Sequence, residues 1–397
     1  MDNKILFISG LQIYPVESGG QKRSSSICES LTQCGFEVTI FSLTGRRDAY
    51  LKLKGDTKFC ANLNLTEFVY MNPVWGLICF LCYRLHIPFI WQSFVLKFLI
   101  PKKLRNLIDS HQTIILDFPY LYPIAQKSDH TKKFILNTHN AEFNLWDSGV
   151  FKKLVQIVES KAIDSCDTSI YCTEGDREAL SKLCGRKLPG PIIPNGLNIS
   201  ELAKYDRTSL REEFRKKLDF REIDDVYIFS GSYFGPNIET LEFIKSFVTE
   251  NFHVLKANNI KIVVLGSVSK ASSQDEVLTI TSRVDDVYPY LCAADKALNL
   301  VTSGSGANVK NYEYIYFELP IITTSVGARG LDLHSGNAII IERDQLLDTM
   351  LNHSLNFSEL SKNAYKQNIE MIDIKISIKK NLNIFKQGPS GSSQEIS

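Results

Sequence analysis

The stretch that decides the fold is VTSGSGANVKNYEYIYFELPIITTSVGARGL, residues 301–331. It follows a predicted strand, and residues 303–306 form a loop of serines and glycines. A helix is predicted over residues 308–318, because Pro320 cannot continue it, and a short apolar strand follows at 321–324. Strand, glycine loop, helix and strand in this order form the βαβ unit of a parallel sheet.

The loop and the first turns of this helix carry the residues that we expect to bind a ligand. Glycines let a ligand approach the backbone, and the free N–H groups of a helix start bind phosphate, so Ser305, Gly306 and Asn308 are candidate contacts. Lys310 lies in the first turn, and Glu313 shares its face. The pair offers a cation for a diphosphate and a carboxylate for a sugar hydroxyl. The alternative is an ordinary connection with a surface Lys–Glu pair.

The run GSG…K-x-x-E…LPIITT…G…GL resembles the donor-site segment of GT-B glycosyltransferases, in particular family 4-like members. The resemblance implies that Glu313 binds the ribose of a nucleotide sugar. Many members carry a second glutamate eight residues upstream, where this chain has Ser305, so that role is not carried over. Glu318 replaces the glycine that usually precedes Leu-Pro.

Three further segments, from residue 194 onward, resemble the same family. Residues 194–196, Pro-Asn-Gly, match its interdomain linker, and 231–237 match its "GS…PN" loop, which implies that Asn237 positions the donor. The alternative for Asn237 is a turn or N-cap residue. The segment 283–291 resembles "G-x-V-x-D", which implies that the backbone near Val284 meets the nucleobase.

The N-terminal half opens with a predicted strand, 4–9, a loop, 10–20, and a helix, 21–33. This is a Rossmann-like start without the GxGxxG spacing, which argues against an NAD-dependent dehydrogenase. The resemblance implies that Gly19 and Gly20 lie near the donor phosphates or the acceptor; the alternative is a tight turn without a ligand.

A second candidate in this half follows a predicted strand at 133–136. His139-Asn140-x-Glu142 resembles the "HN-x-E" segment of some family 4-like members, which implies that His139 enters the donor-sugar site. Ligands bind at the carboxyl ends of strands in open α/β sheets, and that is where His139 lies. The alternative is a structural histidine.

Bulk properties restrict the class of protein. The 397 residues suggest two domains, and a net charge of +1 argues against nucleic acid as a partner. The nine cysteines indicate reduced thiols in the cytoplasm. Cys79-x-x-Cys82 lies in an apolar run and is interpreted as core packing. No metal-ligand cluster is visible, and we expect no required cofactor.

Residues 73–105 are apolar and aromatic, with basic residues at their end. A buried helix pair is the interpretation that we favour. A helix pair lying on an anionic membrane surface is the alternative, so peripheral contact with the inner face of a membrane stays open. No secretory signal is visible, and the run is a poor spanning helix.

We therefore predict an α/β GT-B architecture: two Rossmann-like domains facing a cleft, with a C-terminal helix crossing back to the N-terminal domain. The predicted ranges are 1–200 for the acceptor-side domain, 201–365 for the nucleotide-sugar domain, 366–387 for the returning helix and 388–397 for a disordered tail.

The resemblance implies sugar transfer, with retention, from a nucleotide-diphosphate sugar, with UDP expected as the nucleotide, to a saccharide or lipid-linked acceptor. His139 and Lys310 are the predicted catalytic residues. The Lys-, Ile- and Asn-rich composition suggests bacterial surface polysaccharide synthesis. A GT-B nucleotide-sugar epimerase, a phosphorylase relative and a non-catalytic GT-B partner of another transferase remain alternatives.

Overall fold

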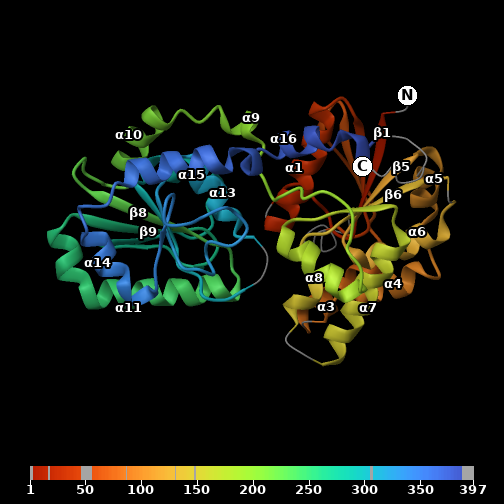
Figure 1. The fold of residues 1–397 in the computed structure, drawn as a ribbon, viewed down its shortest axis with the longest axis horizontal. Coiled ribbons are helices and arrows are strands. Elements are labelled where there is room, and N and C mark those ends of the chain that lie inside the picture. Colours follow the sequence, from red (N-terminus) through yellow and green to blue (C-terminus); the bar gives the residue numbers. More distant parts are fainter. Residues whose placement is uncertain are drawn as a thin grey trace. The chain divides into compact units, whose positions relative to one another are not determined.

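The computed structural model describes residues 3–16, 18–45, 56–85, 87–129, 131–146, 149–304 and 307–386. The predicted tail and two of the expected ligand contacts, Ser305 and Gly306, lie outside these residues. The chain forms two compact units (Figure 1). The first contains the chain up to Gly196 and the chain from Ile374 onward, and the second contains Leu197–Asp373.

The first unit is built on a seven-stranded sheet with the order β3-β4-β2-β1-β5-β6-β7. Its strands pair in parallel, except that β3 runs antiparallel to β4 at one edge. Because β1 lies between β2 and β5, the chain reverses its direction of winding at β1. Such a switch point opens a crevice at the carboxyl ends of the strands. The strands are β1 Lys4–Ser9, β2 Glu37–Ser42, β3 Thr57–Asn62, β4 Leu65–Val69, β5 Thr113–Asp117, β6 Lys133–Asn137 and β7 Thr168–Ile170.

Helices cover both faces of this sheet, because alternate residues of each buried strand are apolar and point to opposite sides. Ile5 and Phe7 of β1 pack with α1 and α16. Leu6 and Ile8 pack on the other side, among α3 to α8. The helices are α1 Gly19–Gln33, α3 Pro73–Arg84, α4 Ile90–Leu96, α5 Lys102–Ser110, α6 Pro123–Lys127, α7 Val150–Ser165, α8 Glu174–Cys184 and α16 Ile374–Lys380, with 3-10 turns at Pro119–Leu121, Glu142–Leu145 and Leu382–Ile384.

The C-terminal segment completes the first unit. Ile374, Ile378 and Phe385 are fully buried or nearly so, and they share a core with Ile27 and Leu31 of α1. The predicted return of the last helix to the N-terminal domain is therefore confirmed.

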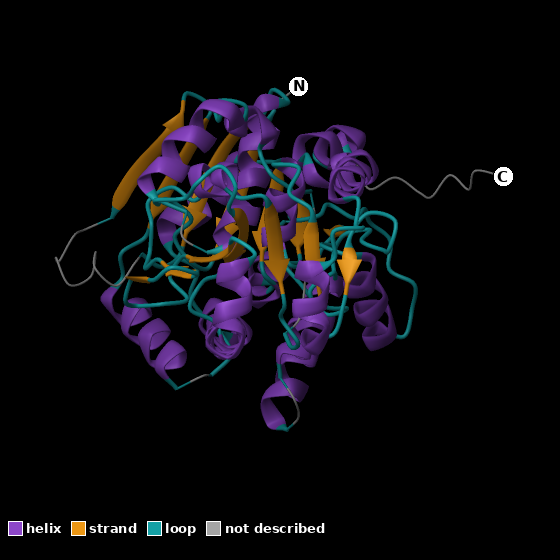
Figure 2. Cartoon of the chain, turned by 90° about the vertical axis from the view of Figure 1, so that its left-hand side faces the viewer, coloured by secondary structure: helices purple, strands orange, loops and turns teal. Residues whose placement is uncertain are grey.

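The second unit repeats the design with the strand order β10-β11-β9-β8-β12-β13-β14. The strands pair in parallel except β10 with β11, and the switch point lies between β8 and β12. Figure 2 shows these strands between layers of helices. The strands are β8 Asp225–Ser230, β9 Ile260–Leu265, β10 Ser273–Gln274, β11 Leu278–Ile280, β12 Lys296–Asn299, β13 Ile321–Thr323 and β14 Ile339–Ile340.

Alternate residues of β8 again divide the core of this unit. Tyr227 and Phe229 face α11 and α14, whereas Val226 and Ile228 face the side that holds α10, α13 and α15. The helices are α9 Ile199–Leu202, α10 Arg207–Lys217, α11 Gly235–Ala257, α12 Tyr288–Ala293, α13 Val309–Tyr316, α14 Leu346–Leu351 and α15 Phe357–Ile372, with a 3-10 turn at Arg343–Gln345.

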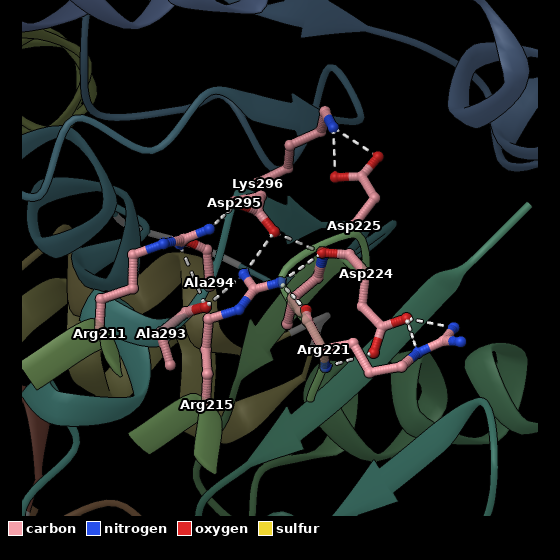
Figure 3. Close-up of polar contacts among 10 residues, drawn as sticks. Arg211, Arg215, Arg221, Asp224, Asp225, Ala293, Ala294, Asp295 and Lys296 are labelled. Atoms are coloured by element: carbon pink, nitrogen blue, oxygen red, sulfur yellow. Dashed lines mark hydrogen bonds and ion pairs between the residues drawn. The ribbon is translucent and has the colours of Figure 1, made fainter. Parts of the chain in front are cut away.

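The charged segment that contains α10 is bound to the sheet through two of its arginine side chains. Arg211 and Arg215 both reach Asp295, at 2.5 and 3.0 Å (Figure 3). Arg215 is buried and also donates to the carbonyls of Arg221 and Asp224, at 2.8 and 2.5 Å. A charge pattern alone does not show which arginine head groups have carbonyl partners.

The apolar segment 73–100 forms α3 and α4, as predicted, but burial is limited to one side. Trp75, Cys79 and Cys82 are buried, whereas Val74 and Leu77 are 64% and 59% exposed. The buried-pair interpretation is therefore correct for one face of α3 and wrong for the other. Among the described residues, no helix is both long and apolar enough to cross a bilayer.

Candidate functional site

Lys310 lies at the switch point of the second sheet. It is in the first turn of α13, which follows β12, and its ammonium lies 4.3 Å from the centroid of the Phe229 ring on β8. Its Nζ donates to Asn237 Oδ1, 2.9 Å away, on the first turn of α11. The structure thus brings together two residues predicted from separate segments, at the strand edge where α/β sheets bind ligands.

The surroundings of Lys310 favour the neutral amine. Burial lowers its pKa to about 7, and the nearby Glu313 carboxylate acts in the opposite direction. A buried ammonium without a full counter-charge is costly, and a cation over one aromatic ring and beside one amide recovers only part of that cost. An anionic group arriving here would supply the missing partner.

Three loops meet around the start of α13. The Asn308 amide donates to the Arg329 carbonyl (3.3 Å), and the Arg329 guanidinium donates to the Gly304 carbonyl (2.8 Å). Gly304 has a φ of +109°, which favours glycine, and it lies next to Phe234 and Pro236 of the 231–237 loop. Arg329 therefore adds a second cationic side chain close to the glycine loop.

A set of asparagine amides fixes this backbone. Asn299, Asn308 and Asn311 each donate through Nδ2 to the carbonyl of Gly327, at 2.9, 3.0 and 2.8 Å. A Cβ at Gly327 would lie 2.2 Å from the Asn299 carbonyl oxygen, so only glycine fits there. The result is a helix start whose position does not depend on a ligand.

The remaining predicted residues of this unit lie near that start. Glu313 is buried, one helical turn beyond Lys310. Val284 is half-buried and packs against the core below α13, in the loop after β11. β11, which precedes Val284, and β12, which precedes α13, lie three places apart in the strand order, so the structure does not bring Val284 next to Lys310.

The first unit has its own polar centre, at the switch point between β1 and β5. Asp117, the last residue of β5, is almost completely buried and accepts four hydrogen bonds. The donors are the hydroxyls of Ser9 and Ser24 at 3.1 and 2.9 Å, Asn137 Nδ2 at 2.8 Å and His139 Nε2 at 2.7 Å. A carboxylate can only accept, so the Nε2 of His139 carries the proton.

The other ring nitrogen of His139 faces the start of α1. The imidazole stacks on Phe118, with centroids 3.9 Å apart and planes 5° apart. A Cβ added to Gly20 would lie 3.6 Å from His139 Nδ1, so these two predicted residues are neighbours. With Nε2 protonated, Nδ1 is an acceptor, and it is available to a hydroxyl group.

Gly19 and Gly20 begin α1, and the loop before them is anchored. Ser18 is the N-cap, and it forms a capping box with Gln21. Buried Glu67 on β4 accepts from the backbone amides of Ile13 and Tyr14, at 2.7 and 3.0 Å. These contacts hold the loop in place without a ligand. The capping box is also what a tight turn without a ligand would show, so the alternative stays open.

Glu142, the glutamate of the HN-x-E segment, points into the protein. It is buried and accepts a hydrogen bond from Tyr120 Oη at 3.3 Å, and burial raises its pKa to about 7. Its amide is held by Glu159, 2.7 Å away. Glu142 thus supports the segment that carries His139.

Sequence reasoning identified none of Asp117, Arg23 and Arg329 as site residues. Arg23 is fully buried in α1 and donates to Asn137 Oδ1 at 3.0 Å, which orients the amide that binds Asp117. The polar end of the strand at 113–117 was a usable signal for Asp117. Arg329 had no such signal, because its place depends on the fold of the 324–330 loop.

Over the part of the chain that the structure describes, no three His, Cys, Asp or Glu side chains are grouped to hold a metal ion. All nine cysteines are described, and all are free thiols.

No protein-family model matches the chain. In sequence it is similar to a Klebsiella pneumoniae protein named "Uncharacterized 44.6 kDa protein in cps region", with 23% identity over 279 residues, or 64% of this chain and 68% of that protein.

In structure the chain is similar to Anabaena HepE in complex with UDP, with a TM-score of 0.66 and 13% identity over 96% of this chain and 98% of HepE. It is also similar to sucrose-phosphate synthase from Thermosynechococcus elongatus, with a TM-score of 0.65 and 12% identity over 96% and 98% of the two chains. A glycosyltransferase from Rickettsia africae gives a TM-score of 0.64 and 13% identity over 96% and 97%. The likeness covers both units, and the chain therefore has the two-domain GT-B fold.

Proposed function

We propose that the protein is a glycosyltransferase that moves a sugar from a nucleoside-diphosphate sugar to a hydroxyl group of an acceptor. The observation that carries the proposal is Lys310: a buried lysine with a pKa lowered to about 7, at the start of a helix and at the switch point of its sheet. A protein has little reason to bury a lysine there unless an anion binds it.

In the proposed reaction, the leaving group is a nucleoside diphosphate whose negative charge grows as the glycosidic bond breaks. Lys310 and the amide groups at the start of α13 stabilise that charge, with Arg329 as a second cation beside the glycine loop. Asn237 holds the Lys310 amine in place, 2.9 Å away. Glu313 binds the ribose, and the backbone near Val284 receives the base.

His139 is the group proposed to contact the sugar. Asp117 fixes its tautomer, so that Nδ1 is an acceptor toward a sugar hydroxyl beside Gly20. Retention of the anomeric configuration without a required metal is the outcome that the resemblance implies, and it is part of this proposal.

We propose UDP as the nucleotide, supported by the likeness to HepE, whose structures contain UDP, glucose and UDP-glucose. The acceptor is proposed to be a saccharide or a lipid-linked saccharide of a bacterial surface polysaccharide. The cps region in the name of the Klebsiella relative supports that pathway. We propose that the reaction takes place in the cytoplasm, which the free thiols and the nucleotide-sugar donor support.

The deciding experiment combines a thermal-shift screen with product analysis. UDP-, GDP- and CMP-sugars are tested, and the correct donor at 100 times its Kd adds about 2.7 kcal/mol of stability. Transfer to saccharide acceptors supports the proposal. Isomerised donor without acceptor reveals an epimerase. Binding without any turnover indicates a non-catalytic partner, and no stabilisation by any nucleotide contradicts all three.

A further inference from the structure

The first unit exposes an unusual concentration of apolar side chains. Of the 22 large hydrophobic side chains that are exposed among the described residues, 13 lie in two segments, 74–99 and 145–157. These segments contain α3, α4 and α7. We call the exposed side of these three helices the α3–α4–α7 surface. Apolar patches of this kind mark interaction sites on soluble domains.

The three helices form one continuous layer. The rings of Trp75 on α3 and Trp91 on α4 meet edge to face, with centroids 5.0 Å apart, and α4 packs against α7. Figure 1 shows the three helices at the same end of the first unit. The exposed residues are therefore parts of one surface and not isolated side chains.

The individual helices carry apolar residues on faces that do not pack against the core of the unit. On α3, Trp75 and Cys79 fill the core, yet Leu77 and Leu81 on the other side are 59% and 45% exposed. Phe94 on α4 and Phe98 just beyond its end are 64% and 75% exposed, and their rings contact each other, with centroids 5.3 Å apart. Exposing these apolar side chains to water is unfavourable, and burying them in an apolar environment would remove that free-energy cost.

Basic residues outnumber acidic ones around this surface, although Lys103 forms an ion pair with Asp56 and Asp164 lies on α7. From Met71 to Ile108 the chain has five lysines and arginines and no acidic residue, and 149–158 adds two lysines. The whole chain carries +1, so the remainder carries 1 − 5 − 2 = −6. A charge distribution this uneven favours an anionic partner over a neutral one.

A basic groove adds a place for a single anionic head group. An open groove of about 430 Å³ beside α7 is lined by Lys153 and Lys161 together with Ile157 and Leu183. Two ammonium groups next to aliphatic side chains match a phosphate attached to an acyl chain.

We infer that the α3–α4–α7 surface docks the protein on an anionic phospholipid membrane, with the aromatic and aliphatic side chains at the level of the acyl-chain boundary and the lysines at the phosphates. Apolar residues and cations on one face are the pattern of helices that lie in the membrane interface. The inference goes beyond sugar transfer and stands on exposure and charge alone.

The test is co-sedimentation of the whole protein with vesicles, without nucleotide or sugar, so that its outcome is independent of the proposed function. Vesicles of phosphatidylcholine alone are compared with vesicles that also contain phosphatidylglycerol. The wild type should bind only the anionic vesicles. Phe94→Asp with Phe98→Asp should weaken binding at least tenfold at unchanged Tm. Lys97→Gln with Lys102→Gln should weaken it about 25-fold, about fivefold for each charge near the surface.

The matched control is Ile223→Asp, which places an acidic residue at a site in the second unit that is 65% exposed. It should bind as the wild type does. Failure of the wild type to bind anionic vesicles, equal binding to both kinds, or binding unchanged by the phenylalanine substitutions would overturn the inference. So would self-association in ultracentrifugation that those substitutions abolish, because the surface would then be a contact between copies.

Discussion

Lys310 combines an unfavourable environment with a position suited to an anion. Burial lowers its pKa to about 7, so the neutral amine competes with the ammonium near neutral pH. A bound diphosphate stabilises the ammonium and raises this pKa again. Binding and protonation at this residue are therefore coupled, which can be measured directly.

The first prediction concerns this coupling. Between pH 7 and 9 the free protein holds Lys310 mostly neutral, so UDP binding must take up a proton, and affinity falls as pH rises, at most tenfold per pH unit. Calorimetry in buffers of different ionisation enthalpy measures the proton uptake. Lys310→Arg keeps its charge throughout this range and should show no such uptake. Equal uptake by the arginine variant would assign the proton to another group.

The second prediction separates a functional lysine from a structural one. The lowered pKa means that the unfolded chain binds more protons than the folded one between about pH 7 and 10.5, so stability rises with pH there. Lys310→Met removes the free-energy cost of burying a charged amine. It should raise the Tm at pH 7, less so at pH 10, while reducing turnover by about 10²-fold or more. The control Lys256→Met alters an exposed lysine and should change neither. A Tm lowered at both pH values would indicate a structural role.

The third prediction concerns the partner of His139. Asp117→Asn cannot accept from four donors, so the histidine loses its fixed tautomer, and kcat should fall by about 10²-fold with a small change in KM. Nitrogen chemical shifts of His139 should change from the Nε2–H form to a mixture. Asp129→Asn, at an exposed position of the same unit, is the control. An unchanged tautomer signal would show that Asp117 does not orient the ring.

At the scale of elements, α10 shows how a charged helix can be part of the fold. One side of α10 holds Arg211 and Arg215 over Asp295, the residue that begins the connection into β12. Asp295 Oδ2 also accepts from the amide of Val226 at 2.8 Å. The network in Figure 3 thus ties α10 to the first residues of two central strands.

The fourth prediction compares the two arginines. Arg215→Met leaves the carbonyls of Arg221 and Asp224 without their buried donor, so it should lower the free energy of unfolding by about 3 kcal/mol. Arg211→Met removes an ion pair to Asp295 and hydrogen bonds to the carbonyls of Ala293 and Ala294. It should cost about 1 kcal/mol, because the Arg211 side chain is partly exposed and water can replace these contacts. Urea unfolding measures both. Equal losses would mean that burial does not decide the contribution.

Elements also show what sequence patterns can predict. The strands predicted at 4–9, 133–136 and 321–324 agree with β1, β6 and β13 to within a residue, because continuous apolar runs between turns have few other structures. The strands β4 and β11 were not predicted. A long helix is harder to delimit: α11 continues to Ala257, since Val248 and Leu255 extend its buried side through a polar segment. The pairing of Asp117 with His139 was not predictable from spacing. It depends on the register of β5 against β6, in which Asp117 lies opposite Asn137.

At the scale of the molecule, the sheets of the two units are wound in the same way, and each has a candidate site at its switch point. The Lys310 site was predicted through motif resemblance, because the glycine loop, helix start and cation lie within a few residues of each other. The site around Asp117 combines residues from β1, α1, β5 and β6. Arg23 and the neighbouring serines are buried because of packing across the whole unit, and a local sequence pattern does not predict such burial.

The fifth prediction tests whether the C-terminal segment stabilises the first unit and not the second. Ile374→Ala with Ile378→Ala creates cavities against α1, and such losses cost about 2–5 kcal/mol each. Hydrogen exchange should speed up in β1 and β2, hundreds of residues away in sequence, and remain slow in β8 and β9. Ile244→Ala, which makes one such truncation in the core of the second unit, should give the reverse pattern. Equal loss of protection in both units would show that they unfold as one.

The return of the chain to α1 also orders events during synthesis. A ribosome completes residues 197–373, all of the second unit, before residues 374–385 emerge from the exit tunnel. Until then the nascent first unit lacks Ile374, Ile378 and Phe385, and the apolar side of α1 that they cover stays open to chaperones. The half that is translated first is thus the half that finishes folding last.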